Sequence, residues 1–217
     1  MIVLVGGIKG GSGKSTIATN LTVIRALSGR DVLLIDADDQ ETAYDFTVRR
    51  NEQTDGNAGY TCIKLTGAAV RTEGARLAKK YDDIIIDSGG RDTTSQRAAI
   101  AIANVMLIPF LPRSFDLWTI EKVAGLVEEM SQANDKLKAY TFLNRTDARG
   151  ADNEETEKEL KNYPAVSFIN TPIGARKAFS NAAATGRAVS ELKPQDDKAS
   201  AEILSLYRAV FEENNIN

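Results

Sequence analysis

The sequence predicts an α/β fold in which helices cover both faces of a doubly wound, mainly parallel sheet. Apolar runs of strand length alternate with helical patterns along its 217 residues. Three of these runs, at 32–35, 84–86 and 105–108, contain no polar residue, which is typical of strands buried on both faces. Consecutive strand–helix units with right-handed crossovers build such a sheet, and ligands bind beyond the carboxyl ends of its strands.

The first half of the chain alternates apolar strands with helices. The helix after the first strand ends before Gly29, a position where glycine commonly terminates a helix. The run at 60–66 mixes polar and apolar residues and is a weaker strand candidate. In order, the patterns predict strands at 2–5, 32–35, 60–66, 84–86 and 105–108, and helices over 15–28 and 68–80.

The second half continues the alternation without an internal repeat or a linker that would divide the chain. A long amphipathic pattern opens it, and the segment 152–161 reads as an exposed acidic helix. In order, the patterns predict helices over 114–133, 152–161, 174–185 and 198–213, with strands at 137–143 and 165–169. We therefore expect a single domain spanning residues 1–217.

The composition excludes several classes of site. Histidine is absent, which excludes imidazole catalysis and histidine–metal ligation, and the single cysteine, Cys62, excludes an internal disulfide. The net charge of −3 means that any nucleic-acid contact must come from a local basic patch. No apolar run is long enough to span a membrane, and no signal peptide precedes the first strand, so we expect a cytoplasmic protein.

A glycine-rich stretch between the first strand and the first helix predicts a phosphate-binding loop. It consists of Lys9, Gly10, Gly11, Ser12, Gly13, Lys14, Ser15 and Thr16. Glycines allow the backbone N–H groups to point inward around an anion, and the helix N-terminus adds its dipole. We expect Lys14 to reach the β- and γ-phosphates of a nucleotide and the Ser15 hydroxyl to ligate Mg²⁺.

The loop departs from the general phosphate-loop pattern because Ile8 stands where glycine is usual and a second lysine, Lys9, heads the loop. The order Lys-Gly-Gly-x-Gly-Lys-Ser/Thr-Thr resembles the deviant Walker A motif of the ParA/MinD family of ATPases. The resemblance implies a P-loop ATPase that binds ATP with Mg²⁺. It also implies that Lys9 reaches across a homodimer interface to the partner's nucleotide and that Lys9 and Lys14 act in catalysis.

Two acidic stretches follow strands of the predicted sheet. Asp36, Asp38 and Gln40 match the Asp-x-Asp-Pro-Gln stretch of ParA-like ATPases, with Asp39 in place of proline. The resemblance implies that Asp38 supports hydrolysis and that Asp36 lies nearer the metal.

The other stretch is a Walker B arrangement that ends at Asp87. Such a carboxylate holds Mg²⁺ through water, and we expect the same of Asp36. The glycines Gly89 and Gly90 follow, where family members often have prolines, and predict a mobile segment that senses the γ-phosphate.

Two later residues are candidates for contacts with the base. Asn144 ends a predicted strand, and its amide can donate to and accept from an adenine edge. The resemblance places Asn144 at the family's base-contacting asparagine and Pro172 in the loop that closes over the base. Asparagine and proline are also ordinary turn residues, which is the competing interpretation.

The resemblance also implies a function in DNA partition. ATP-bound dimers would bind DNA without sequence preference and associate with the nucleoid. A centromere-binding, ParB-like partner would then stimulate slow hydrolysis, so that a plasmid or chromosome is segregated. Because the chain starts at its first strand, it resembles the short plasmid-type ParA proteins, and we expect no N-terminal helix-turn-helix domain. Candidate DNA contacts in 170–193 are Arg176, Lys177, Arg187 and Lys193, against Glu191 alone; a solvated helix face is an equal alternative.

Other functions remain open. A ParA-like ATPase can position a protein cargo or aid conjugation, and Asp39 with the two glycines could give an ATP-gated binding module with negligible turnover. A MinD-like membrane cycle needs a basic amphipathic C-terminal helix, whereas residues 211–217 are acidic and polar, so we expect no membrane partner. One cysteine excludes the iron–sulfur relatives. The pattern of a dinucleotide-dependent oxidoreductase is not satisfied, because Thr16 stands where its third glycine belongs.

Overall fold

A computed structural model of the chain describes residues 1–112, 114–147 and 151–212, and the side chains of 114–118 and 151 are left aside. It contains one sheet in the strand order β3-β2-β4-β1-β5-β6-β7, with β8 paired to β6, and every pairing is parallel. The strands are β1 Ile2–Val5, β2 Val32–Ala37, β3 Thr61–Lys64, β4 Asp83–Ser88, β5 Val105–Phe110, β6 Lys138–Thr146, β7 Ser167–Phe168 and β8 Ile173–Gly174.

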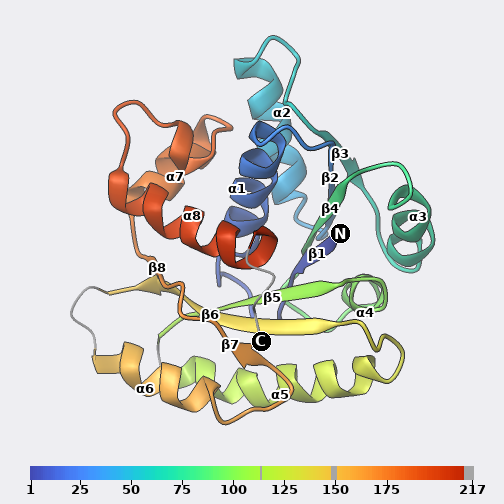
Figure 1. The fold of residues 1–217 in the computed structure, drawn as a ribbon, viewed down its shortest axis with the longest axis vertical. Helices are drawn as coiled ribbons and strands as arrows, with labels where there is room; N and C mark the ends of the chain where they lie inside the picture. The colour runs from blue at the N-terminus through green and yellow to red at the C-terminus, as the bar shows by residue number, and fades with distance from the viewer. Residues whose placement is uncertain (113, 148–150, 213–217) are drawn as a thin grey trace.

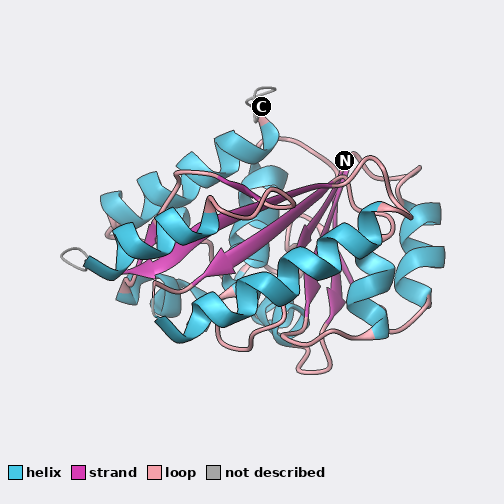
Figure 2. Cartoon of the chain, turned by 90° about the horizontal axis from the view of Figure 1, so that it is seen from below, coloured by secondary structure: helices cyan, strands magenta, loops and turns pink. Residues whose placement is uncertain are grey.

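Helices cover both faces of this sheet. They are α1 Lys14–Leu27, α2 Thr42–Gln53, α3 Ala69–Leu77, α4 Thr94–Ile100, α5 Ser114–Ser131, α6 Ala151–Leu160, α7 Lys177–Ala184 and α8 Asp197–Phe211, with a 3₁₀ turn η1 at Val189–Glu191. Figure 1 shows α1, α7 and α8 on one side of β5 and β6 and α5 with α6 on the other. Figure 2 shows the strands lying between helices. The predicted doubly wound parallel sheet is confirmed.

The two faces of the sheet carry separate hydrophobic clusters. Val3 and Val5 pack with α1 and α8 on one face, whereas Ile2 and Leu4 pack with α4 and α5 on the other. Successive side chains of a strand point to opposite faces, so an uninterrupted apolar strand contributes to both clusters. This is why the central strands contain almost no polar residues before their carboxyl ends.

The register of the central strands brings the acidic residues to the glycine-rich loop. Val5, the last residue of β1, pairs with Asp87 of β4, and Asp87 in turn pairs with Asp36 of β2. Both aspartates therefore lie at the same edge of the sheet as the loop that follows β1. Their position agrees with the expectation that ligands bind beyond the strand ends.

Several predicted elements differ from the structure. The helix expected from residue 174 begins at Lys177, because Ile173 and Gly174 pair with Asn144 and Thr146 as β8. The strand expected at 165–169 is limited to Ser167–Phe168, and the helix expected over 68–80 ends at Leu77. Two helices, α2 and α4, were not predicted. None of the described helices is long and apolar enough to cross a membrane, and most of the acidic C-terminal tail, 213–217, lies outside the described residues.

Candidate functional site

The loop between β1 and α1 has the backbone of an anion-binding nest. Gly11 and Gly13 adopt φ angles of 75° and 93°, a region that favours glycine. Gly13 is the N-cap of α1, and a side chain there would collide with the amide of Asn144. Glycine at this position is therefore required both by the backbone conformation and by the close approach of β6.

Lys14 begins α1 and points back into the loop. Its side chain is buried, and Nζ donates a hydrogen bond to the Lys9 carbonyl oxygen at 2.8 Å. Burial lowers the pKa of the Lys14 ammonium, while the carboxylates of Asp87 and Asp38 oppose this shift. The ammonium thus lies against the Lys9 carbonyl oxygen and near the carboxylates of Asp87 and Asp38, at the place where the loop would bind a phosphate.

Asp36 and Asp38 occupy different environments. Asp36 is buried and accepts hydrogen bonds from the Asp38 and Tyr44 N–H groups, at 3.1 and 2.8 Å. Burial raises the pKa of Asp36, and these hydrogen bonds oppose the increase. Asp38 is half-buried and accepts a backbone hydrogen bond from the Gln40 N–H at 3.2 Å. Asp36 therefore fixes the start of α2, whereas Asp38 lines the cavity described below.

Asp87 fits the role of a carboxylate that holds a hydrated metal ion. It is fully buried, and neither oxygen accepts a hydrogen bond of normal geometry from the described part of the chain. Burial raises the pKa of Asp87 to about 8, and Ser15 and Lys14 counteract part of this increase. A buried carboxylate without partners is costly, and water bound to a Mg²⁺ ion would satisfy it. Residues 1–112, 114–147 and 151–212 hold no cluster of three or more His, Cys, Asp or Glu residues suited to a metal.

Two adjoining cavities meet at the first turn of α1. The first, of about 660 Å³, is lined by loop residues together with Asp38 and Gly89–Gly90. The second, of about 600 Å³, contains Asn144 and shares Gly13, Thr16 and Arg145 with the first. Each has the size of a small-molecule site, so an elongated ligand can extend from the glycine-rich loop toward Asn144.

The structure separates the two candidate base contacts. Asn144 is buried, and its Nδ2 donates to the Ser12 carbonyl oxygen at 2.6 Å, which fastens β6 to the loop. Pro172 is exposed and lines a different cavity, of about 370 Å³, with Asp147 and Asn170. Asn144 therefore belongs to the loop site, whereas Pro172 lies in a neighbouring cavity that shares Gly174, Ala175 and Arg176 with it.

Four residues that sequence reasoning missed line the first cavity. They are Thr42, Arg91, Thr93 and Arg145. Arg145 is exposed and has a φ of 55°, a strained conformation for arginine, and it lies at a register shift of β6. Its place next to Asn144 was the only available signal, because neither the bulge nor the left-handed backbone can be read from residue types.

The four candidate DNA contacts have different surroundings in the structure. Arg176 is engaged by Glu202 of α8, with an Nε–Oε2 distance of 2.8 Å and a second contact through Nη2. Lys177, Arg187 and Lys193 are exposed. Glu202 lies outside the segment 170–193, so Arg176 contributes less positive charge than the charge balance of that segment suggested.

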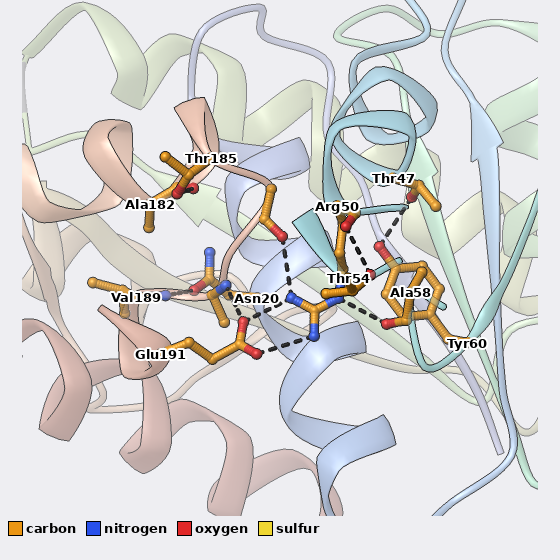
Figure 3. Close-up of polar contacts among 12 residues, drawn as sticks. Asn20, Thr47, Arg50, Thr54, Ala58, Tyr60, Ala182, Thr185, Val189 and Glu191 are labelled. Atoms are coloured by element: carbon orange, nitrogen blue, oxygen red, sulfur yellow. Dashed lines mark hydrogen bonds and ion pairs between the residues drawn. The ribbon is translucent and has the colours of Figure 1, made fainter. Parts of the chain in front are cut away.

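A buried arginine, Arg50, connects α2 to Glu191 of the η1 turn (Figure 3). Arg50 forms a bidentate pair with Glu191, at 2.7 and 3.0 Å, and its Nε and Nη1 donate to the carbonyl oxygens of Ala58 and Gly186. Gly186 has a φ of 62° and packs directly against the Arg50 backbone. The negative charge of Glu191 is thus already neutralised within the fold.

Comparison with known proteins identifies the family. The family model of the CobQ/CobB/MinD/ParA nucleotide-binding domain matches residues 3–189 of this chain. The chain belongs to this family. The resemblance drawn from the Lys9–Thr16 loop is therefore confirmed, and ATPases are known within the CobQ/CobB/MinD/ParA family.

Individual relatives of this chain are named for different processes. Maintenance of carboxysome distribution protein A from Halothiobacillus neapolitanus is 27% identical over 209 residues, covering 95% of this chain and 94% of the relative. The chromosome-partitioning ATPase Soj from Thermus thermophilus is 25% identical over 235 residues, covering 94% and 91%. The solved ATP complex of McdA from Cyanothece has a TM-score of 0.79 at 18% identity, covering 96% and 95%, and so shares the fold.

Proposed function

We propose that the protein is a ParA-like ATPase that dimerises on ATP, binds DNA without sequence preference and hydrolyses ATP to segregate plasmid or chromosomal DNA. The observation that carries this proposal is the convergence of Lys14, Asp38 and Asp87 on one glycine-rich loop at the carboxyl edge of the sheet. This arrangement combines an anion nest, a buried ammonium and two carboxylates with different environments.

The residues suggest how ATP would be hydrolysed. The loop N–H groups and Lys14 bind the β- and γ-phosphates and stabilise the charge that develops on them. Asp38, which lines the cavity, positions the attacking water. Ser15, Asp87 and Asp36 would hold Mg²⁺, which supplies further charge neutralisation when bound. Lys9 heads the loop, and in the face-to-face dimer it completes the site of the partner subunit.

The roles of the two lysines can be separated by measuring nucleotide binding and turnover with Mg·ATP. Lys14→Ala removes the buried ammonium and should abolish measurable ATP binding. Lys9→Ala should bind ATP but lose hydrolysis that depends on dimerisation, by about 10²-fold or more, since one preorganised charge-stabilising group is worth that much. Equal hydrolysis by the wild type and Lys9→Ala would contradict the cross-dimer role.

A second candidate function is the positioning of a protein cargo. It is favoured by the carboxysome-distribution relative, which matches almost the full length of both chains. The same ATP cycle would serve both functions, and the difference lies in the partner that stimulates hydrolysis. A ParA-like ATPase that aids conjugation, or an ATP-gated module with negligible turnover, would also use this site.

A further inference from the structure

The segment after β4 lies close to the phosphate loop, and at Gly90 the space admits only glycine. A side chain at Gly90 would place its Cβ 2.5 Å from the Gly10 nitrogen and 2.7 Å from the Lys9 carbonyl carbon. A side chain at Gly89 would lie 3.1 Å from an oxygen of Asp38. Gly89 and Gly90 therefore form the wall of the cavity between the head of the phosphate loop and the turn that follows β2.

One buried amide holds this wall in place. Gln96 of α4 is fully buried, and the amide orientation that satisfies its surroundings donates from Nε2 to the carbonyl oxygens of Gly7 and Gly89, at 3.0 and 3.1 Å. The backbone N–H of Gln96 donates to the hydroxyl of Thr93, the residue that caps α4, at 3.2 Å. Gly7 lies at the base of the phosphate loop, so a single side chain joins that base to the segment carrying Gly90.

This wall lies on the side of the site where the γ-phosphate of a bound nucleotide would be. In the proposed function, Lys14 binds the β- and γ-phosphates, and the base of the nucleotide extends toward Asn144 through the second cavity. Asp38 and Gly89–Gly90 line the first cavity, outside the second. With the base in the second cavity, a nucleoside triphosphate would reach this wall with its terminal phosphate, whereas a diphosphate would end before it.

We propose that Gln96 is a positioning residue that sets the Gly89–Gly90 segment for the γ-phosphate and so determines the preference of the site for ATP over ADP. Gln96 acts through the main chain and does not touch the nucleotide. The inference rests on the proposed ATPase function and goes beyond it by assigning the discrimination between substrate and product to a buried residue of α4.

The test compares Gln96→Met with a matched control, Asn134→Leu. Methionine keeps an unbranched side chain of similar length but donates no hydrogen bond. Asn134 also donates from one amide to two carbonyl oxygens, those of Ile100 and Ala103 at 2.8 Å each, at the opposite end of α4. Both variants therefore lose the same kind of interaction, but only Gln96→Met loses it beside the cavity.

The measured quantities are the dissociation constants of Mg·ADP and of a non-hydrolysable Mg·ATP analogue, at a temperature where both variants are folded. Gln96→Met should weaken binding of the analogue about tenfold relative to ADP, the change that corresponds to one net hydrogen bond. Asn134→Leu should keep the wild-type ratio. An unchanged ratio in Gln96→Met overturns the inference alone, whereas a wild type that binds neither nucleotide overturns the proposed function and this inference with it.

A measurement on the wild-type protein covers the case in which Gln96→Met does not fold. Amide hydrogen exchange should slow in residues 89–96 when the ATP analogue binds, and much less when ADP binds. Equal protection by the two nucleotides would show that the segment does not sense the γ-phosphate and would overturn the inference.

Discussion

Asp36 and Asp38 are neighbouring carboxylates of the same chemistry, but they differ in their hydrogen bonds and in their contact with the cavity. Each oxygen of Asp36 accepts a hydrogen bond from one backbone N–H group, which fixes the turn before α2. Asp38 accepts a backbone hydrogen bond from Gln40 and lines the cavity. The spacing of the two aspartates does not rank them as metal ligands, and the different roles expected of them came from the family resemblance.

This difference predicts that Asp38→Ala retains ATP binding and loses turnover. The expected fall in kcat is about 10²- to 10⁴-fold, the contribution of a positioned acid–base group, and the ATP-bound dimer should accumulate. Asp39→Ala is the control, since Asp39 lines the same cavity and carries the same charge. Turnover of Asp38→Ala at the wild-type rate, or an equal loss in Asp39→Ala, would remove Asp38 from the mechanism.

At the scale of elements, the sequence predicts the central strands and the loop well because their signals are local. An uninterrupted apolar run identifies a buried strand, and glycines before Lys14 identify the loop. The helix α2 was missed because its residues are mostly polar, with only Ala43, Phe46, Thr47 and Arg50 buried. The two-residue strand β8 forms through pairing with β6, about 30 residues away, which no local pattern indicates.

Ion pairs between residues that are far apart in the sequence could not be predicted from local patterns either. Arg50 and Glu191 are separated by 141 residues, and Arg176 and Glu202 by 26. Charge counts over a segment treat each of these residues as free surface charge. The fold instead pairs Arg50 with Glu191 and Arg176 with Glu202, so the charge counted over 170–193 differs from the charge that this surface presents.

The Arg50–Glu191 pair gives a prediction for the stability of the fold. Arg50→Ala leaves Glu191 with the Ala188 N–H alone and leaves two carbonyl oxygens, those of Ala58 and Gly186, without the arginine donor. Leaving buried acceptors unsatisfied costs about 1–3 kcal/mol each in the free energy of unfolding. Arg76→Ala is the control, because Arg76 and Glu73 form a pair whose side chains are 60% and 41% exposed, worth less than about 1 kcal/mol. Denaturant unfolding of both variants measures the difference, and similar small losses would contradict the structural importance of Arg50.

At the scale of the whole molecule, the net charge of −3 makes DNA binding depend on where the cations lie. Lys177 and Arg187 are exposed near opposite ends of α7, and neither forms an ion pair with the residues that the structure describes. Dimerisation would double their number on one assembly. We therefore expect these two residues, more than Arg176, to contact phosphates.

Binding to random-sequence duplex DNA tests this expectation. The wild type should be retained with ATP and released with ADP, and affinity should fall steeply with salt. The double variant Lys177→Gln, Arg187→Gln should lower the log–log salt slope by about 0.9 for each phosphate contact that the substitutions remove. Lys79→Gln, Lys80→Gln removes the same charge after α3, on the far side of the molecule from α7 (Figure 1), and should bind as the wild type does.

Equal weakening in both double variants would indicate a general charge effect and not a DNA-binding face. No DNA binding in any nucleotide state, with hydrolysis intact, would instead favour a protein cargo.

The two edges of the sheet bear on how copies of the chain can self-associate. One edge strand, β3, has four residues and carries Lys64, which pairs with Glu41. The other edge is formed by β7 and β8, which have two residues each. Short edge strands and edge lysines are features by which proteins prevent strand-to-strand aggregation. We therefore expect filaments of this protein, if they form, to grow through helical surfaces or the nucleotide face, and amyloid-like sheet extension to be disfavoured.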